Sequence, residues 1–129
     1  MNGPVASGSK FELRRDGDGL ACLTLNPDTR WEVGDHHELV AACDEVRSQG
    51  ERLFLLMPLE HLIGASSAAR QLGATEGLPS RVGAMAFCGG NAIGVMVVNT
   101  WIKLSRPPMA VRVFGTVDAG RAWLRHLRG

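Results

Sequence analysis

The sequence has little of what marks a disulfide-rich or zinc-binding domain. It contains only three cysteines, Cys22, Cys43 and Cys88, and no C-x-x-C pair. An odd number of widely spaced cysteines argues against a disulfide framework and a zinc knuckle, and it favours a reducing compartment such as the cytoplasm. We therefore expect three buried thiols that pack as small apolar side chains.

A strong excess of charge of one sign is also absent. Lys and Arg number 14 against 13 Asp and Glu, a net charge of +1, which argues against a general nucleic-acid binder. Hydrophobic residues make up 45% of the chain and charged residues 21%, as in an ordinary globular protein. The chain has no tyrosine, so its core is expected to be mainly aliphatic. Its 129 residues predict one domain over 11–129, after a flexible tail over 1–10.

Charge is nevertheless uneven along the chain. From Thr100 onward, six Lys or Arg residues accompany a single acidic residue, Asp118. Such a basic segment could meet an anionic partner, or it could simply be the solvated face of a helix.

A helix that spans a membrane is not expected. The first ten residues lack the apolar stretch of a signal peptide. Residues 82–102 carry no charge and are long enough to cross a bilayer, but Gly89, Gly90 and Asn91 interrupt them. The segment is better interpreted as a buried strand, a tight turn and an apolar helix.

The hydrophobic pattern predicts strands and helices that alternate. Two short strands at 11–15 and 20–25 around an Asp/Gly turn predict a β-hairpin. The remaining pattern predicts helices at 35–48, 66–73, 91–104 and 116–127, and strands at 52–57, 82–87 and 110–114. A hairpin followed by αβαβαβα predicts an α/β fold, with a mixed sheet of about five strands and four helices.

A first candidate ligand site follows the strand at 82–87. Here Cys88, Gly89, Gly90 and Asn91 lie between a strand and a helix. Backbone amides at glycines and at a helix start can bind an anion, and a thiol there can have a lowered pKa. The segment lacks both G-x-G-x-x-G and a P-loop lysine, and a tight turn would explain both glycines without a ligand.

A second candidate is a partner surface on the helix at 91–104, which is apolar nearly all round. One stripe comprises Ile93, Met96, Val97, Trp101 and Leu104. We expect part of the remainder to form a dimer or ligand surface, namely Val95, Val98, Asn99 and Ile102. The alternative is a helix buried beneath residues 59–81.

Catalytic and metal motifs are missing. Ser66 and Ser67 at a predicted helix start could cap that helix or accept a phosphate. Adjacent His36 and His37 would point about 100° apart on a helix, so they do not predict a metal site. The sequence has neither H-E-x-x-H nor G-x-S-x-G, and no motif places a base near Cys88. We expect no cofactor and no enzymatic activity.

Three segments resemble the C-terminal half of SpoIIAA-like proteins of the STAS superfamily. They are VVNTWIKLSRPP at 97–108, VRVF at 111–114 and AWL at 122–124. The resemblance covers about residues 52–127. It implies a STAS-like mixed sheet layered against helices, in a non-enzymatic signalling or binding domain.

The resemblance also implies what the domain would bind. In anti-sigma-factor antagonists, a serine after an aspartate at a helix start is phosphorylated by a partner kinase. Ser66 or Ser67 matches that position, although Ala65 replaces the aspartate. The same branch is similar to Sec14-type lipid-binding domains. The implied partners are therefore another protein, a second copy of the chain, or a small apolar or anionic ligand.

Overall fold

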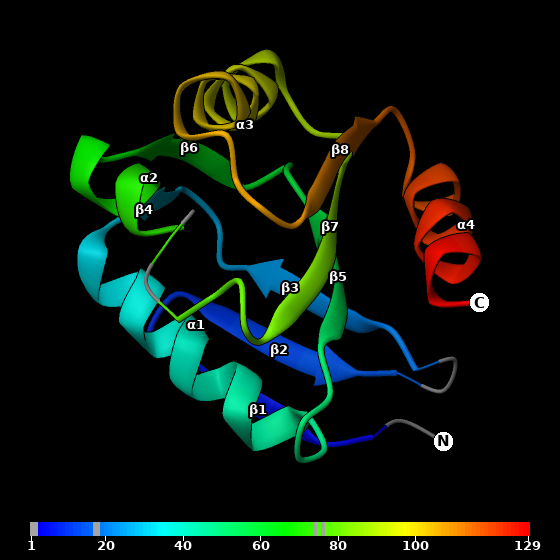
Figure 1. The fold of residues 1–129 in the computed structure, drawn as a ribbon. Helices are drawn as coiled ribbons and strands as arrows, with labels where there is room; N and C mark the ends of the chain where they lie inside the picture. Colours follow the sequence, from blue (N-terminus) through cyan, green and yellow to red (C-terminus); the bar gives the residue numbers. More distant parts are fainter. Residues whose placement is uncertain (1–2, 17–18, 74, 76) are drawn as a thin grey trace.

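Six strands form a mixed sheet through the middle of the molecule (Figure 1). The computed structural model describes residues 3–16, 19–73, 75 and 77–129. The strand order is β1 (Val5–Ser7), β2 (Phe11–Arg15), β3 (Ala21–Leu25), β5 (Leu53–Pro58), β7 (Val82–Cys88) and β8 (Ala110–Phe114). The β1/β2 and β2/β3 pairs are antiparallel, whereas β3/β5, β5/β7 and β7/β8 are parallel.

Four helices and a second, small sheet complete the fold. The helices are α1 (Val33–Val46), α2 (Ser67–Gly73), α3 (Ala92–Ser105) and α4 (Val117–Arg128). The small sheet is a parallel pair, β4 (Thr29–Trp31) and β6 (Leu62–Ala65). The predicted α/β class, mixed sheet and four helices are confirmed.

The strand count differs from the prediction. The main sheet has six strands rather than about five, because the segment predicted as a flexible tail contains β1. Ala6 is buried, and β1 pairs with β2 from Val5 opposite Arg14 to Ser7 opposite Glu12. The prediction missed β1, β4 and β6 because strands of three or four residues are too short to show alternation.

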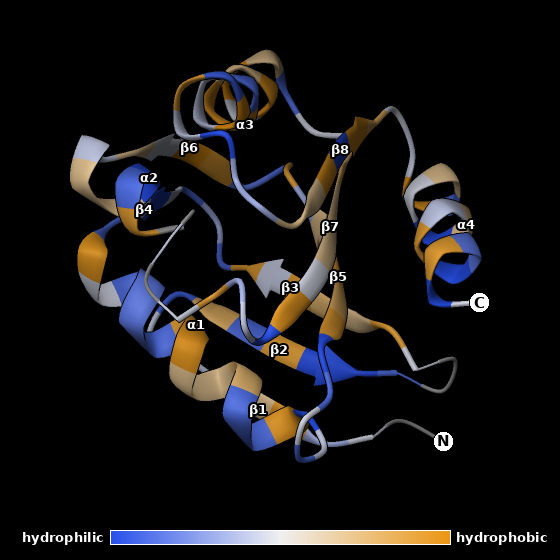
Figure 2. Cartoon of the chain, viewed as in Figure 1, coloured by the Kyte–Doolittle hydropathy of each residue, from blue (hydrophilic) through white to orange (hydrophobic). Residues whose placement is uncertain are grey.

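The helices divide between the two faces of the sheet. Figure 1 shows α1, α2 and α3 on one side and α4 alone on the other. Residues along β7 alternate accordingly: Met85 and Phe87 belong to the large core beneath α1–α3, and Ala84, Ala86 and Cys88 to the smaller core beneath α4. Figure 2 shows the corresponding concentration of apolar residues in the central strands, with hydrophilic residues on α1 and α4.

The start of α1 differs from the expected one in an informative way. The predicted helix begins at 35, whereas α1 begins at Val33 with Glu32 as its N-cap. Asp35 is buried in the first turn, where its Oδ2 accepts the Glu32 N–H at 2.8 Å and pairs with Lys10 Nζ at 2.8 Å. The helix ends at Val46, before the predicted end at 48, and Gly50 (φ 77°) lies in the loop that follows.

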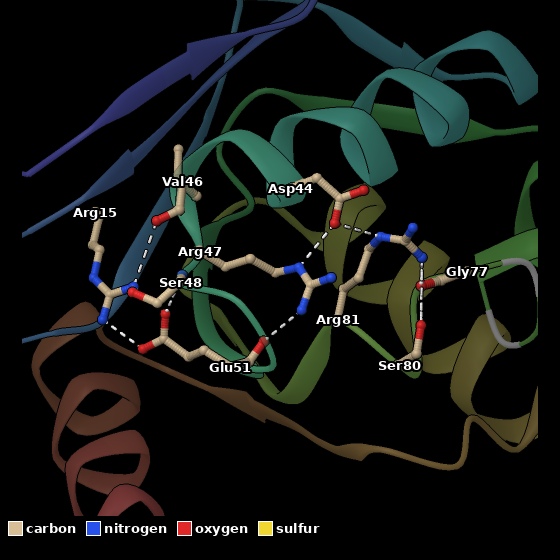
Figure 3. A network of polar contacts seen from close by, with 9 residues as sticks. All are labelled: Arg15, Asp44, Val46, Arg47, Ser48, Glu51, Gly77, Ser80 and Arg81. Carbon is tan, nitrogen blue, oxygen red and sulfur yellow. Dashed lines mark hydrogen bonds and ion pairs between the residues drawn. The ribbon is translucent and has the colours of Figure 1, made fainter.

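A polar network joins the hairpin, the end of α1 and Arg81, the residue before β7 (Figure 3). Arg15 forms a two-pronged ion pair with Glu51, whose carboxylate also accepts the Ser48 N–H at 2.9 Å. Asp44 Oδ1 accepts from Arg47 Nε at 2.8 Å and from Arg81 Nε at 2.9 Å. The contact between Arg15 and Glu51 joins the loop between α1 and β5 to β2. The contact between Asp44 and Arg81 joins α1 to the start of β7.

We predict that this network makes stability sensitive to acid. The Arg15 guanidinium and, to a smaller extent, the Ser48 N–H hold the pKa of Glu51 below its ordinary value of 4.5. Its contribution is therefore complete above pH 4.5 and is lost as the pH falls through the lowered pKa. Glu51→Gln should cost about 0.5–1 kcal/mol at pH 7, measured by urea unfolding. The difference from wild type should shrink below pH 4.

Exposed Glu45→Gln is the matched control, and an equal loss of stability in both variants would contradict the prediction.

Candidate functional site

An apolar cavity of about 80 Å³, here called the Trp101 cavity, lies between the main sheet and the layer that contains α1, α2 and α3. Its walls come from both sheets and from all three of these helices. The lining residues are Trp31, His36, Leu39, Met57, Leu62, Ala65, Ala69, Arg70, Leu78, Met85, Phe87, Val97, Val98 and Trp101.

The floor of the cavity is set by the sheet. Met57 on β5 and Phe87 on β7 are paired in register, and Met85 lies two residues before Phe87 on the same face. All three side chains are buried. They supply an apolar floor with no hydrogen-bonding group other than the weak acceptor sulfurs of methionine.

The Trp101 side chain on α3 contributes a polar group, its indole N–H, to the cavity region. Its ring packs edge-on against Phe87, with centroids 5.9 Å apart at 80°, and the residue is only 8% exposed. Its indole Nε1–H is buried and has no hydrogen-bond acceptor among the described residues. A buried donor without a partner costs about 1–3 kcal/mol, and a group bound in the cavity could supply the missing acceptor.

Arg70 on α2 lies at the edge of the cavity and is half-buried. Its Nη2 donates to Ser67 Oγ at 3.3 Å, and its carbonyl accepts from Ser105 Oγ at 3.4 Å. None of the carboxylates that the structure describes forms an ion pair with Arg70. Trp31, Ala65 and Val97 are lining residues that are also half-buried, so the cavity opens to solvent.

The predicted site at 88–91 proves to have local structural roles. Gly89 (φ 60°) and Gly90 (φ 89°) turn the chain, and a Cβ on Gly90 would lie 2.7 Å from Leu59 Cβ. Asn91 caps α3, since its side-chain oxygen accepts the Gly94 N–H at 2.8 Å. Because Cys88 faces α4, it does not reach the Trp101 cavity. The structure therefore does not bring these four residues together with the cavity.

Of the three thiols expected to be buried, those of Cys43 and Cys88 are buried and that of Cys22 is half-buried. The possible lowering of the Cys88 pKa is not found. Burial raises its pKa to about 11 instead of lowering it, and α4 packs so closely that a Cβ on Gly120 would lie 2.3 Å from Cys88 Sγ. Burial likewise raises the pKa of Cys43 to about 12 and that of half-buried Cys22 above its usual value. All three cysteines are free thiols.

The face of α3 that is buried differs from the predicted one. Val98 is buried and lines the cavity, Val95 and Ile102 are half-buried against the core, and Asn99 is exposed. Of the stripe expected to be buried, three members are exposed: Ile93 (48%), Met96 (61%) and Leu104 (72%). A helix that is apolar nearly all round carries too weak a period to identify its buried face.

Close backbone packing explains the orientation of α3. A Cβ on Gly94 would lie 2.9 Å from the carbonyl oxygen of Leu59 and 3.3 Å from that of Leu62. The glycine therefore directs its side of the helix toward the β5–β6 connection. Val98 and Trp101 lie one and two turns further along the same side, so they face the cavity.

Ser66 and Ser67 lie at the start of α2. Ser66 Oγ accepts the Ala69 N–H at 3.1 Å, which confirms its predicted role as a cap. Ser67 is exposed and accepts from Arg70. Ser66 follows Ala65 in the chain and Ser67 accepts from Arg70, and both Ala65 and Arg70 line the cavity.

The two adjacent histidines lie in different environments. His36 is buried and lines the cavity, whereas His37 is exposed; their ring centroids are 5.6 Å apart. Across residues 3–16, 19–73, 75 and 77–129, no three His, Cys, Asp or Glu side chains form a group that could hold a metal ion. Over the same ranges, no helix combines the length and apolar character needed to cross a bilayer.

Sequence reasoning missed much of the cavity. The sequence pattern predicts no functional role for four lining residues, Arg70, Trp31, Leu62 and Leu78. It predicts only an apolar packing role for Trp101. These residues lie on separate elements with no common motif or spacing. Trp101 offers the single usable signal, because a tryptophan on a buried helix face needs an acceptor for its N–H.

Comparison with known proteins identifies the fold. Residues 13–128 match the model of a family described as a domain of unknown function, DUF7793. A crystal structure of an uncharacterized protein from the DUF3478 family of Shewanella loihica PV-4, described as having a SpoIIAA-like fold, is similar with a TM-score of 0.60. The match covers 96% of this chain and 95% of that one at 15% identity. No curated protein matches the chain. The predicted SpoIIAA-like fold is confirmed.

We predict that the three thiols differ sharply in reactivity. At pH 8, a pKa of about 11 leaves only about one Cys88 side chain in a thousand as thiolate. Iodoacetamide should therefore modify Cys22 first, and Cys43 and Cys88 should be at least about a hundredfold slower. Peptide mass spectrometry over a time course would measure the three rates. Unfolded protein in guanidinium is the control, where the rates should become similar. Rapid, selective alkylation of Cys88 in the folded protein would contradict the prediction.

Proposed function

The chain belongs to the DUF7793 family, and we propose that it is a non-enzymatic binding domain that holds a small, mainly apolar ligand in the Trp101 cavity. The observation that carries the proposal is an apolar cavity with one buried, unpartnered donor, the Trp101 indole N–H, in its wall. Small-molecule sites commonly combine apolar walls with a few placed polar groups.

The dimensions of the cavity limit the ligand. An apolar cavity of about 150 Å³ accepts benzene, so about 80 Å³ accommodates roughly three to five carbon atoms. The rim of Trp31, Ala65, Arg70 and Val97 is half-buried, which leaves an entrance for such a group. A ligand of this kind supports a carrier or sensor function.

A second candidate is a regulatory protein-interaction domain, of the type found in anti-sigma-factor antagonists. It is supported by the exposed apolar row of Ile93, Met96 and Leu104 on α3. The candidate switch positions, Ser66 and Ser67, lie at the start of the neighbouring helix α2. Ser67 is exposed, whereas the Ser66 hydroxyl is engaged in the cap.

We predict that filling the Trp101 cavity abolishes ligand binding. Ala69 lines the cavity and is 1% exposed, so Ala69→Leu places an isopropyl group inside it. Isobutanol is the neutral probe, and the Trp101 indole N–H signal in a ¹H–¹⁵N NMR spectrum is the readout. Wild-type protein should give a saturable shift, and Ala69→Leu should give none.

The matched control is Ala68→Leu, which makes the same change on the exposed side of α2. It should bind isobutanol like the wild type. Thermal unfolding of both variants shows whether Ala69→Leu remains folded, since overpacking can cost about 1–3 kcal/mol. If the shift is equal in both variants, or never saturates in wild type, the cavity is not a binding site.

The second candidate gives a separate prediction. If α3 is an interface between two copies, the wild type should sediment as a dimer at micromolar concentration, and Leu104→Glu should be a monomer. The 72% exposure of Leu104 means that this change leaves the core intact. The matched control is exposed Asn99→Glu, and a monomeric wild type would count against self-association.

A further inference from the structure

We propose that the ligand of the Trp101 cavity is a short aliphatic monocarboxylate, with its chain in the cavity and its carboxylate between Arg70 and the Trp101 indole N–H. This inference rests on the proposed function, because it requires that the cavity binds a ligand at all. It adds the chemical class of the ligand and the direction in which it lies.

The first step is the number and kind of donors at the cavity. Trp101 Nε1–H is a buried donor that lacks an acceptor within the described part of the chain. Arg70 is the one side chain with a permanent charge among the described lining residues, and none of the described carboxylates pairs with it. A carboxylate has two oxygens, so it can accept from both groups at once.

The second step is that Arg70 and Trp101 line the same small cavity, from two helices that touch. Ser105 Oγ donates to the Arg70 carbonyl at 3.4 Å, which joins the end of α3 to α2. Trp101 lies one helical turn before Ser105 on the same side of α3, about 6 Å along the helix. Because the cavity measures only about 80 Å³, a carboxylate held by Arg70 at its edge is also close to Trp101.

The third step is the asymmetry of the cavity. Arg70 is half-buried at the rim, whereas Met57, Met85 and Phe87 form a buried floor. A charged group is stable only at the rim, where a cation and solvent remain within reach. The hydrocarbon part must then point inward, and its length is limited by a volume of about 80 Å³. A phosphate dianion suits the site less well, because Arg70 offers one positive charge.

The experiment compares a carboxylate with its neutral isostere. Sodium isovalerate and isovaleramide have the same branched chain, and calorimetry together with the Trp101 indole signal measures both dissociation constants. Wild-type protein should bind isovalerate at least about tenfold more tightly than isovaleramide. Sodium octanoate should bind more weakly than isovalerate, since its chain exceeds the cavity.

Variants of the two donors test their roles. Arg70→Gln should remove the preference and leave isovaleramide binding unchanged, and Arg70→Lys should restore part of it. Trp101→Phe should weaken both ligands, because both offer an oxygen to the indole N–H. Arg14→Gln makes the same change of charge on β2, which contributes no residue to the cavity lining, and should behave as the wild type.

The outcomes distinguish failure of the carboxylate inference from failure of the proposed function. Equal binding of isovalerate and isovaleramide, or a preference that survives in Arg70→Gln, would overturn the carboxylate and leave an apolar binding site standing. Tighter binding of octanoate would overturn the inward direction of the chain. If isobutanol, isovaleramide and isovalerate all fail to shift the Trp101 signal, the proposed function and this inference fall together.

Discussion

The central strands β5 and β7 must be covered on both faces, and the rest of the fold follows from how unequally their two faces are filled. On the α4 side, β7 presents Ala84, Ala86 and Cys88, which are small. Gly120 lets α4 approach until there is no room even for a Cβ. On the opposite side, the same two strands present Met57, Met85 and Phe87. One face therefore packs tightly against a single helix, and the other supports several elements at a greater distance.

The Trp101 cavity arises on that second face. Three helices and the β4–β6 pair meet over bulky side chains, and irregular layers of this kind leave space more readily than one helix on a flat sheet of small residues. The cavity combines apolar walls with one unmatched buried donor and a cation at the rim, Trp101 and Arg70. Structural stability alone does not account for a buried N–H without an acceptor, since most such groups in proteins are paired. This is why the ligand site is proposed at the cavity rather than at residues 88–91.

Several expectations were right because local rules decide them. The predicted cap at Ser66 and the predicted helix starts at Asn91 and Thr116 agree with the structure, where each side chain accepts an N–H three residues ahead in the chain. The hairpin strands β2 and β3 and the buried strands β5, β7 and β8 agree with the prediction to within about one residue, since continuous or alternating apolar runs are visible in the sequence. The tail was misjudged because Ala6 joins the core only through pairing with β2.

The sequence by itself determined the α/β class, the order of most elements, the starts of α2, α3 and α4 and the interruption at Gly89 and Gly90, because each depends on neighbours within a few positions. Only the tertiary structure decided which face of α3 is buried, since its apolar residues surround it and the choice depends on close contact between Gly94 and Leu59. The same is true of the site. Arg70 and Trp101 are 31 positions apart, on α2 and α3, and only the packing of those helices over the sheet brings them to one cavity. Cys88 combines both levels: composition predicted a buried thiol, and its packing against α4 is what raises its pKa to about 11.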